Sequence, residues 1–320
     1  MPARRAIIRV PPWLPIGVGA VLTAVLGIAA ADGTRLPAWL TPFRDGPPAE
    51  VERAAASATA VWHRAVRLIA DARHTSPDDA LIGRETSPLV TTLGDVEAKR
   101  VSASPSWPAA FVREFHRGGL RHGDVVAASF SGSFPALNLA IVSAAQAMGL
   151  RLVAVSSVTA SSFGATEPGF TWPEIEVRLV NAGVIGAASA GISAGGDGDR
   201  ADDLEEDGRA LARAIAARCA RELGAALIAP GSFDEAVRGR LALFDAARGR
   251  ARLAAFVNVG GTQAALGRST AILKVQNGWL PREPFDGSAG RGMVALMVDR
   301  GVPVLHILNV RDLALRWGIL

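Results

Sequence analysis

The pattern of hydrophobic and polar positions is clearest between residues 123 and 158. Residues 124–130 form a short, valine-rich apolar run, which is typical of a strand buried on both faces of a parallel sheet. A turn of small residues follows, and apolar residues then recur at helical spacing until Gly149, which is placed to end a helix. A second apolar run begins at residue 152. This pattern predicts a strand–helix–strand unit around which the rest of the chain is organised.

Predicted strands and helices continue to alternate to the end of the chain, and this order predicts an α/β fold. Further strands are predicted over residues 184–192, 225–229, 253–259 and 302–310, and helices over residues 49–73, 111–116, 172–182, 204–223, 233–247, 292–300 and 312–317. Such alternation is typical of a doubly wound, Rossmann-like parallel sheet, here of about five or six strands. Residues 81–108 are polar and rich in turn formers, and their length predicts a binding loop.

A segment without charged side chains lies near the amino terminus, at residues 10–31. At about 1.5 Å per residue, a helix of this length spans a hydrocarbon core of roughly 30 Å. Arg4, Arg5 and Arg9 precede the segment, and positive flanking charge favours the cytoplasmic side of a membrane. The pattern predicts a single-pass protein of the cell membrane, with a cytoplasmic amino terminus and residues 32–320 outside the cytoplasm.

A cleaved signal peptide is the alternative interpretation of this segment. Ala29 and Ala31 would satisfy a small-residue cleavage site, but the apolar run is longer than the usual core of a signal peptide. Both interpretations export the rest of the chain. With an uncleaved anchor, the predicted division is a cytoplasmic amino terminus and transmembrane anchor (residues 1–31), a proline-rich tether (32–50) and an α/β domain (51–320).

The charge balance argues against a nucleic-acid partner. The chain has 34 basic and 30 acidic side chains, and three of the basic ones precede residue 10. The remainder of the chain is therefore almost neutral and has no general basic field that would hold a polyanionic backbone.

Hydroxyl-bearing residues and glycines follow three of the predicted strands and predict a ligand site. Because parallel strands end at one edge of a sheet, these loops should converge on one side, where helix amino termini favour a carboxylate or phosphate. The predicted ligand-binding residues are Ser129, Ser131, Gly132, Ser133, Asn138, Ser156, Ser157, Ser161, Ser162, Asn258, Gly260, Gly261 and, from the long polar loop, Lys99. The alternative is that Ser133 only caps the following helix, with Pro135 in its first turn.

A nucleophilic serine is a further hypothesis for the same loops. The candidates are Ser131 as nucleophile, His306 as a base from a later strand, and Glu85 from the long loop. The run from Ser129 to Ser133 lacks the first glycine of the G-x-S-x-G elbow. The sequence therefore leaves open whether the protein is an enzyme.

Neither a cofactor nor a metal is predicted. The glycines that follow the strand at 253–259 do not have the G-x-G-x-x-G spacing, and no Walker lysine follows any glycine-rich loop. The four aspartates within residues 197–203 lack the bidentate glutamate of an EF-hand in register, so they predict a solvated loop. The five histidines are scattered without metal-ligand spacing.

Four dispersed segments carry a resemblance to a known family. They are ETSPLVTTLGDVEAKR, GDVVAASFSGSFPALN, SSVTASSFGAT followed by TW, and FVNVGG. Together they resemble the poly-gamma-glutamate system protein family, whose members are membrane-anchored accessory proteins encoded with the poly-gamma-glutamate synthase. The resemblance implies a role in the synthesis or export of this capsule-type polymer, with the synthase membrane subunits and the polyanionic polymer as partners. It implies no catalytic residues.

A second likeness concerns the fold alone. GDVVAASFSGS with its helix and VAVSSV is similar to the sugar-isomerase (SIS) type of α/β domain. Three functions follow as expectations: binding of the polymer, its ends or the synthase; hydrolysis or transfer of gamma-glutamyl chains outside the cytoplasm; and binding of a sugar ligand in an SIS-like site.

Overall fold

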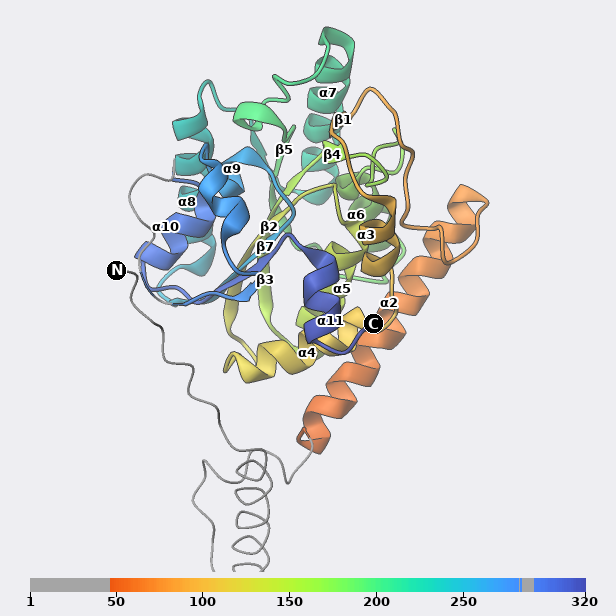
Figure 1. Ribbon diagram of the computed structural model, residues 1–320, viewed down its shortest axis with the longest axis vertical. Helices are drawn as coiled ribbons and strands as arrows, with labels where there is room; N and C mark the ends of the chain where they lie inside the picture. The colour runs from red at the N-terminus through yellow and green to blue at the C-terminus, as the bar shows by residue number, and fades with distance from the viewer. Residues whose placement is uncertain (1–46, 282, 284–290) are drawn as a thin grey trace, which may run out of the picture. The chain divides into compact units, whose positions relative to one another are not determined.

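A seven-stranded sheet is the central element of the computed structural model, which describes residues 47–281, 283 and 291–320 (Figure 1). The order of its strands is β6 (Ala226–Ile228), β5 (Ser189–Ser193), β3 (Arg151–Ser157), β2 (Val125–Phe130), β7 (Leu253–Val259), β9 (Val304–Ile307) and β8 (Gly278–Trp279). All neighbouring pairs are parallel except β8 with β9. The prediction of an α/β fold on a mostly parallel sheet is confirmed, with an antiparallel edge strand that the sequence pattern did not predict.

Helices cover both faces of the sheet. On one face, α2 (Ala49–Arg73), α4 (Trp107–Arg117) and α5 (Pro135–Met148) share a hydrophobic core with alternate residues of the strands, such as Val126 and Ala128 of β2. On the other face, α8 (Phe233–Arg248) and α10 (Met293–Asp299) pack against Val125 and Ala127. Strand β2 is buried at every position because both of its faces are covered.

The remaining elements lie around this frame. They are α3 (Val96–Ser102), α6 (Trp172–Asn181), α7 (Glu206–Leu223), α9 (Gln263–Leu266), α11 (Val310–Arg316), two short 3₁₀ helices at Asp197–Asp199 and Thr270–Lys274, and a two-stranded parallel sheet of β1 (Val90–Thr92) and β4 (Ala160–Ser161). Among the described residues no helix has the length and apolar character needed to cross a membrane. The predicted anchor at residues 10–31 and most of the predicted tether lie outside those residues, whereas Ala49 and Glu50 already belong to α2.

The long polar loop predicted over residues 81–108 is partly regular, which corrects the sequence interpretation. It contains β1, which pairs with β4, and the helix α3. The side chain of Asp95 accepts a hydrogen bond from the backbone N–H of Glu97 at 2.9 Å and so caps α3. A short helix among polar residues has no apolar periodicity long enough to reveal it.

Two strand boundaries also differ from the prediction, for local reasons. The strand predicted at 184–192 is β5, which begins only at Ser189, where the Glu176 carboxylate accepts the backbone N–H groups of Ala188 and Ser189. The strand predicted at 302–310 ends at Ile307, because the Asn309 side chain accepts the N–H of Asp312 and starts α11. The helix predicted at 111–116 is the longer α4.

A fully buried ion pair holds the carboxyl ends of three strands together. The guanidinium of Arg240, on α8, donates to both carboxylate oxygens of Asp199 at 2.8 and 2.7 Å, and neither side chain is exposed. It also donates to the hydroxyls of Ser129 at 3.4 Å, Ser157 at 3.3 Å and Ser193 at 3.1 Å, which lie at the ends of β2, β3 and β5. One side chain therefore fixes three strand ends and the turn that carries Asp199.

Replacement of this arginine should cost much of the stability of the fold. In Arg240→Met the Asp199 carboxylate stays buried without its partner, so the free energy of unfolding should fall by about 3–5 kcal/mol. Arg238→Met is the matched control, because Arg238 is exposed on the same helix, and it should change the free energy by less than about 0.5 kcal/mol. Chemical denaturation measures both, and equal losses in the two variants would contradict the role given to the buried pair.

Candidate functional site

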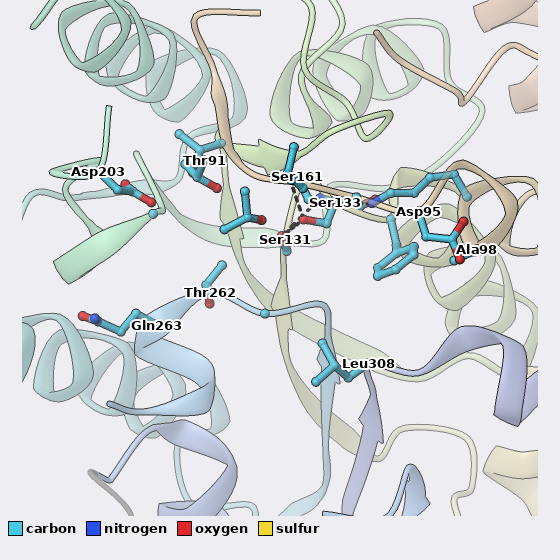
Figure 2. A pocket seen from close by; sticks show the side chains of 18 of the residues that line it. Thr91, Asp95, Ala98, Ser131, Ser133, Ser161, Asp203, Thr262, Gln263 and Leu308 are labelled. Atoms are coloured by element: carbon cyan, nitrogen blue, oxygen red, sulfur yellow. Dashed lines mark hydrogen bonds between the residues drawn. The ribbon is translucent and has the colours of Figure 1, made fainter. Parts of the chain in front are cut away.

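The order of the strands places a crevice beside β2. From β2 the chain builds the sheet outward through β3, β5 and β6, and then returns to place β7 on the other side of β2. In open α/β sheets, ligands bind outside the carboxyl ends of the strands where the direction of winding reverses. A cavity of ≈ 480 Å³ lies at this position, and the loops that follow β2, β3 and β7 all contribute to its wall (Figure 2).

Serine side chains connect two of these loops. The Ser131 hydroxyl donates to the Ser133 hydroxyl at 3.0 Å, and the backbone N–H of Ser161 donates to the same Ser133 oxygen at 3.0 Å (Figure 2). Ser133 is not the cap of α5, because the N-cap position is Phe134 and carries no side-chain cap bond. The backbone N–H of Ser133 donates to Ser131 Oγ at 3.1 Å, so this amide already has a partner within the loop.

Lys99 is buried in the wall of the cavity, with 2% of its surface exposed. Its Nζ donates to the backbone carbonyl of Ser133 at 2.5 Å and to Ser161 Oγ at 2.7 Å, and lies 4.1 Å from the centre of the Phe134 ring. Burial lowers the pKa of the Lys99 ammonium to about 7, against the opposing effect of the Asp95 carboxylate. A large share of these amines is therefore neutral near pH 7.

The opposite part of the wall is acidic and polar. Asp197 and Asp203 line the cavity, together with Thr262 and Gln263 at the start of α9, which follows β7. Gln263 holds the two segments together, because its Oε1 accepts the backbone N–H of Gly198 at 2.9 Å. Figure 2 shows Asp203 and Gln263 on one side of the cavity and Ser161, Ser133 and Asp95 on the other.

The prediction of a solvated loop at the acidic turn is confirmed for two of its aspartates and wrong for a third. Asp197 and Asp203 are exposed and line the cavity, whereas Asp199 is buried in its ion pair with Arg240. Their position directly after β5 was the available signal, since this turn follows the carboxyl end of a parallel strand as the serine loops do. Among the described residues no group of three or more histidine, cysteine or acidic side chains is placed to hold a metal ion.

Several predicted ligand-binding residues hold the loops in place without lining the cavity. Ser129 and Ser157 bond to Arg240 beneath it. Asn138 donates from Nδ2 to the backbone carbonyl of Ser131 at 2.8 Å, and so ties α5 to the turn. Ser156 lies at 2.6 Å from Ser189 Oγ and accepts from the indole N–H of Trp172 at 3.0 Å. The buried Ser162 contacts the carbonyl of Thr92 at 3.5 Å.

Fewer than half of the predicted ligand-binding residues line the cavity. Of the predicted set, Ser131, Ser133, Ser161, Gly261 and Lys99 contribute to its wall. The cavity is also lined by residues that were not predicted as ligand-binding, among them Thr91, Thr92, Asp95, Thr159, Thr262 and Gln263.

The structure does not bring the proposed catalytic residues together. His306 lies on β9 beside β7, and its Nδ1 is 3.1 Å from Nδ2 of Asn258, which also donates to the Gly260 carbonyl. Burial lowers the pKa of His306 to about 4, so the ring is neutral near pH 7. The hydroxyl of Ser131 instead contacts Ser133, and the exposed Glu85 does not line the cavity.

Comparison with known proteins provides no relative from which a function can be transferred. No family model matches the chain, and the searches of curated proteins and of solved structures found none similar to it.

Two glycines allow the loops to approach each other closely enough to form the cavity. Gly260 has a φ of 80°, and a Cβ atom there would lie 2.7 Å from Cβ of Ser131, whose N–H donates to the Val259 carbonyl at 3.1 Å. A Cβ atom at Gly132 would lie 2.9 Å from the Thr159 carbonyl oxygen. Side chains at either position would push apart the loops after β2, β3 and β7.

Gly260→Ala should destabilise the protein more than Gly224→Ala, although both glycines have a positive φ. Gly224 has a φ of 65°, and a Cβ atom there would have no neighbouring atom within 4 Å, so Gly224→Ala carries only the backbone cost of about 1–2 kcal/mol. Gly260→Ala adds the overlap with Ser131, which should lower the free energy of unfolding by a further amount of about 1–3 kcal/mol. Denaturation curves test this, and equal losses would show that the approach of the two loops is not tight.

Proposed function

We propose that this chain is an accessory protein of poly-gamma-glutamate synthesis or export, and that its α/β domain binds the amino end of a gamma-glutamyl chain. The observation that supports this most is the position of the four segments that carry the family resemblance. Each of them contributes to the wall of one cavity: in order, they provide Asp95 and Lys99, Ser131 and Ser133, Thr159 and Ser161, and Gly261. Segments far apart in the chain thus meet at a single site.

The charges around the cavity favour a chain end over the interior of the polymer. In a gamma-linked chain every residue keeps its α-carboxylate, so the interior is a polyanion, and only the amino-terminal residue adds an ammonium group. Asp95, Asp197 and Asp203 line the cavity, and Lys99 is the one basic side chain among the described residues that do so. Carboxylates repel a polyanion and attract an ammonium group, for which Asp197 and Asp203 are accessible partners.

The other parts of the proposal rest on the sequence. Residues 10–31 serve as a single-pass anchor, with the amino terminus in the cytoplasm and the α/β domain outside it, where the polymer emerges. The synthase membrane subunits are the proposed partners. The sheet is proposed to be a doubly wound, Rossmann-like and SIS-like one, and this likeness supports a second candidate function, the binding of a sugar ligand by the hydroxyl-lined and carboxylate-lined cavity.

Calorimetry with defined gamma-glutamate oligomers tests the proposal on the full chain. Oligomers with a free amino end should bind, and acetylation of that end should weaken binding about tenfold to a hundredfold, since one bond to a charged group contributes roughly 1.5–3 kcal/mol. Asp203→Asn should have an effect of similar size. Asp78→Asn is the matched control, because Asp78 is exposed and does not line the cavity.

Equal binding of free and acetylated oligomers would contradict recognition of the amino end. Absence of binding to any oligomer, together with binding of a sugar phosphate that Asp203→Asn weakens, would favour the SIS-like alternative.

A further inference from the structure

Lysine is rare in this chain, and its two positions differ in how far they are buried. Of the 34 basic side chains, only those at positions 99 and 274 are lysines, and all others are arginines. Lys274 is exposed, whereas Lys99 is buried in the cavity wall. An arginine keeps its proton at every physiological pH, and a lysine can release it when it is desolvated. The buried position therefore carries the one type of basic side chain that can act as a base.

The surroundings of Lys99 favour a neutral amine. No carboxylate lies within 4.0 Å of its Nζ in the described part of the chain, where the nearest polar partners are the Ser133 carbonyl and Ser161 Oγ. The Phe134 ring face, the two oxygen acceptors and the more distant Asp95 carboxylate all favour the charged form, but the effect of burial is larger and lowers the pKa of the amine. A buried amine without a counter-ion loses its proton readily, because low-dielectric surroundings disfavour the charged form.

Ser161 is placed as the partner of this amine. Its Oγ is 2.7 Å from Lys99 Nζ, it is partly exposed, and it lines the cavity. Its backbone is fixed from two sides, since its N–H donates to Ser133 Oγ and its strand β4 pairs with β1. Gly94 also lies against it, because a Cβ atom there would be 3.2 Å from Ser161 Oγ. A hydroxyl, a base within hydrogen-bond distance and an open cavity are the elements of nucleophilic catalysis.

We infer that Ser161 and Lys99 form a nucleophile–base pair that cleaves or transfers acyl groups, with an amide or ester carbonyl in the cavity as the substrate. Lys99 Nζ takes the hydroxyl proton while Ser161 Oγ forms a bond to the carbonyl carbon. The carbon–nitrogen or carbon–oxygen bond then breaks, and the proton on Nζ passes to the leaving amine or alcohol. Water, or an acceptor amine, next attacks the Ser161 ester, gives a proton to Nζ and releases the acyl group, and Nζ returns the proton to Ser161 Oγ.

This inference uses the cavity of the proposed binding site but does not depend on which polymer binds there. It also differs from the serine hypothesis of the sequence, because Ser161 and Lys99 replace Ser131 and His306 as the reacting pair. Lys99 was predicted from the sequence as a positive charge for a ligand, whereas here it acts in its neutral form.

A fluorophosphonate probe tests the pair directly on the full chain. The probe should form a single adduct at Ser161, located by mass spectrometry of peptides, as the Oγ–phosphorus bond forms, fluoride leaves and Lys99 takes the proton. The labelling rate should rise with pH, with a midpoint near 7, and level off above it, because only the neutral amine of Lys99 can accept the proton.

The variants separate the chemistry from the fold. Ser161→Ala should remove the adduct, and Lys99→Arg should slow labelling by about a hundredfold or more, the usual contribution of a general base. Lys99→Met is a second variant without a base, in case the larger arginine prevents folding, and circular dichroism confirms the fold of each. Lys274→Arg, which changes the exposed lysine, should label at the rate of the unchanged protein.

Three results would overturn the inference: no adduct on the folded protein between pH 6 and 9, an adduct on another serine, or undiminished labelling in folded Lys99→Met. None of these results bears on the calorimetric test of oligomer binding, so the two proposals can fail separately.

Discussion

The buried Arg240–Asp199 pair is the contact on which the arrangement of the strand ends depends. A guanidinium removed from water needs a partner for its charge and acceptors for its N–H groups, and here Asp199 and the hydroxyls of Ser129, Ser157 and Ser193 provide them. These groups come from three adjacent strands and the acidic turn. The pair therefore fixes the level at which β2, β3 and β5 end and the position from which Asp197 and Asp203 face the cavity.

The other half of the cavity depends on the amine of Lys99, which is buried and has few polar contacts. Helix α3 is held in place by the Asp95 cap and by the Trp107 indole, which donates to the Val101 carbonyl at 2.8 Å. This position brings Lys99 under the loops after β2 and β3, where burial favours the neutral form. The acidic half of the cavity is thus suited to recognise a charged group, and the half with Lys99 and Ser161 is suited to react with a neighbouring carbonyl.

Much of the fold followed from the sequence because its causes are local. The valine-rich run of β2 and the helical spacing before Gly149 each show in a short window, and so the order of strands and helices was predictable. The strand β8 was not, since two residues carry no periodicity. Arg240 was also missed, because its burial depends on Asp199, which lies 41 residues away in the chain.

For the candidate site, the sequence indicated the end of the sheet but not the roles of single side chains. That loops after parallel strands share one edge is a rule of topology, and it placed Ser131, Ser133, Ser161 and Gly261 near one another. Whether a serine faces the cavity or packs beneath it, as Ser157 does, depends on contacts between distant segments. The same holds for Lys99, whose burial no local pattern reveals.

The most direct test of this account is the titration of the Lys99 amine by nuclear magnetic resonance. With only two lysines in the chain, isotope-labelled lysine gives two side-chain signals, and Lys274→Arg assigns them. The Lys99 signal should titrate with a midpoint near pH 7, well below the ordinary lysine pKa of about 10.4. A midpoint above about 10 for Lys99 would mean that the amine stays charged, and it would contradict the role of Lys99 as the base of the site.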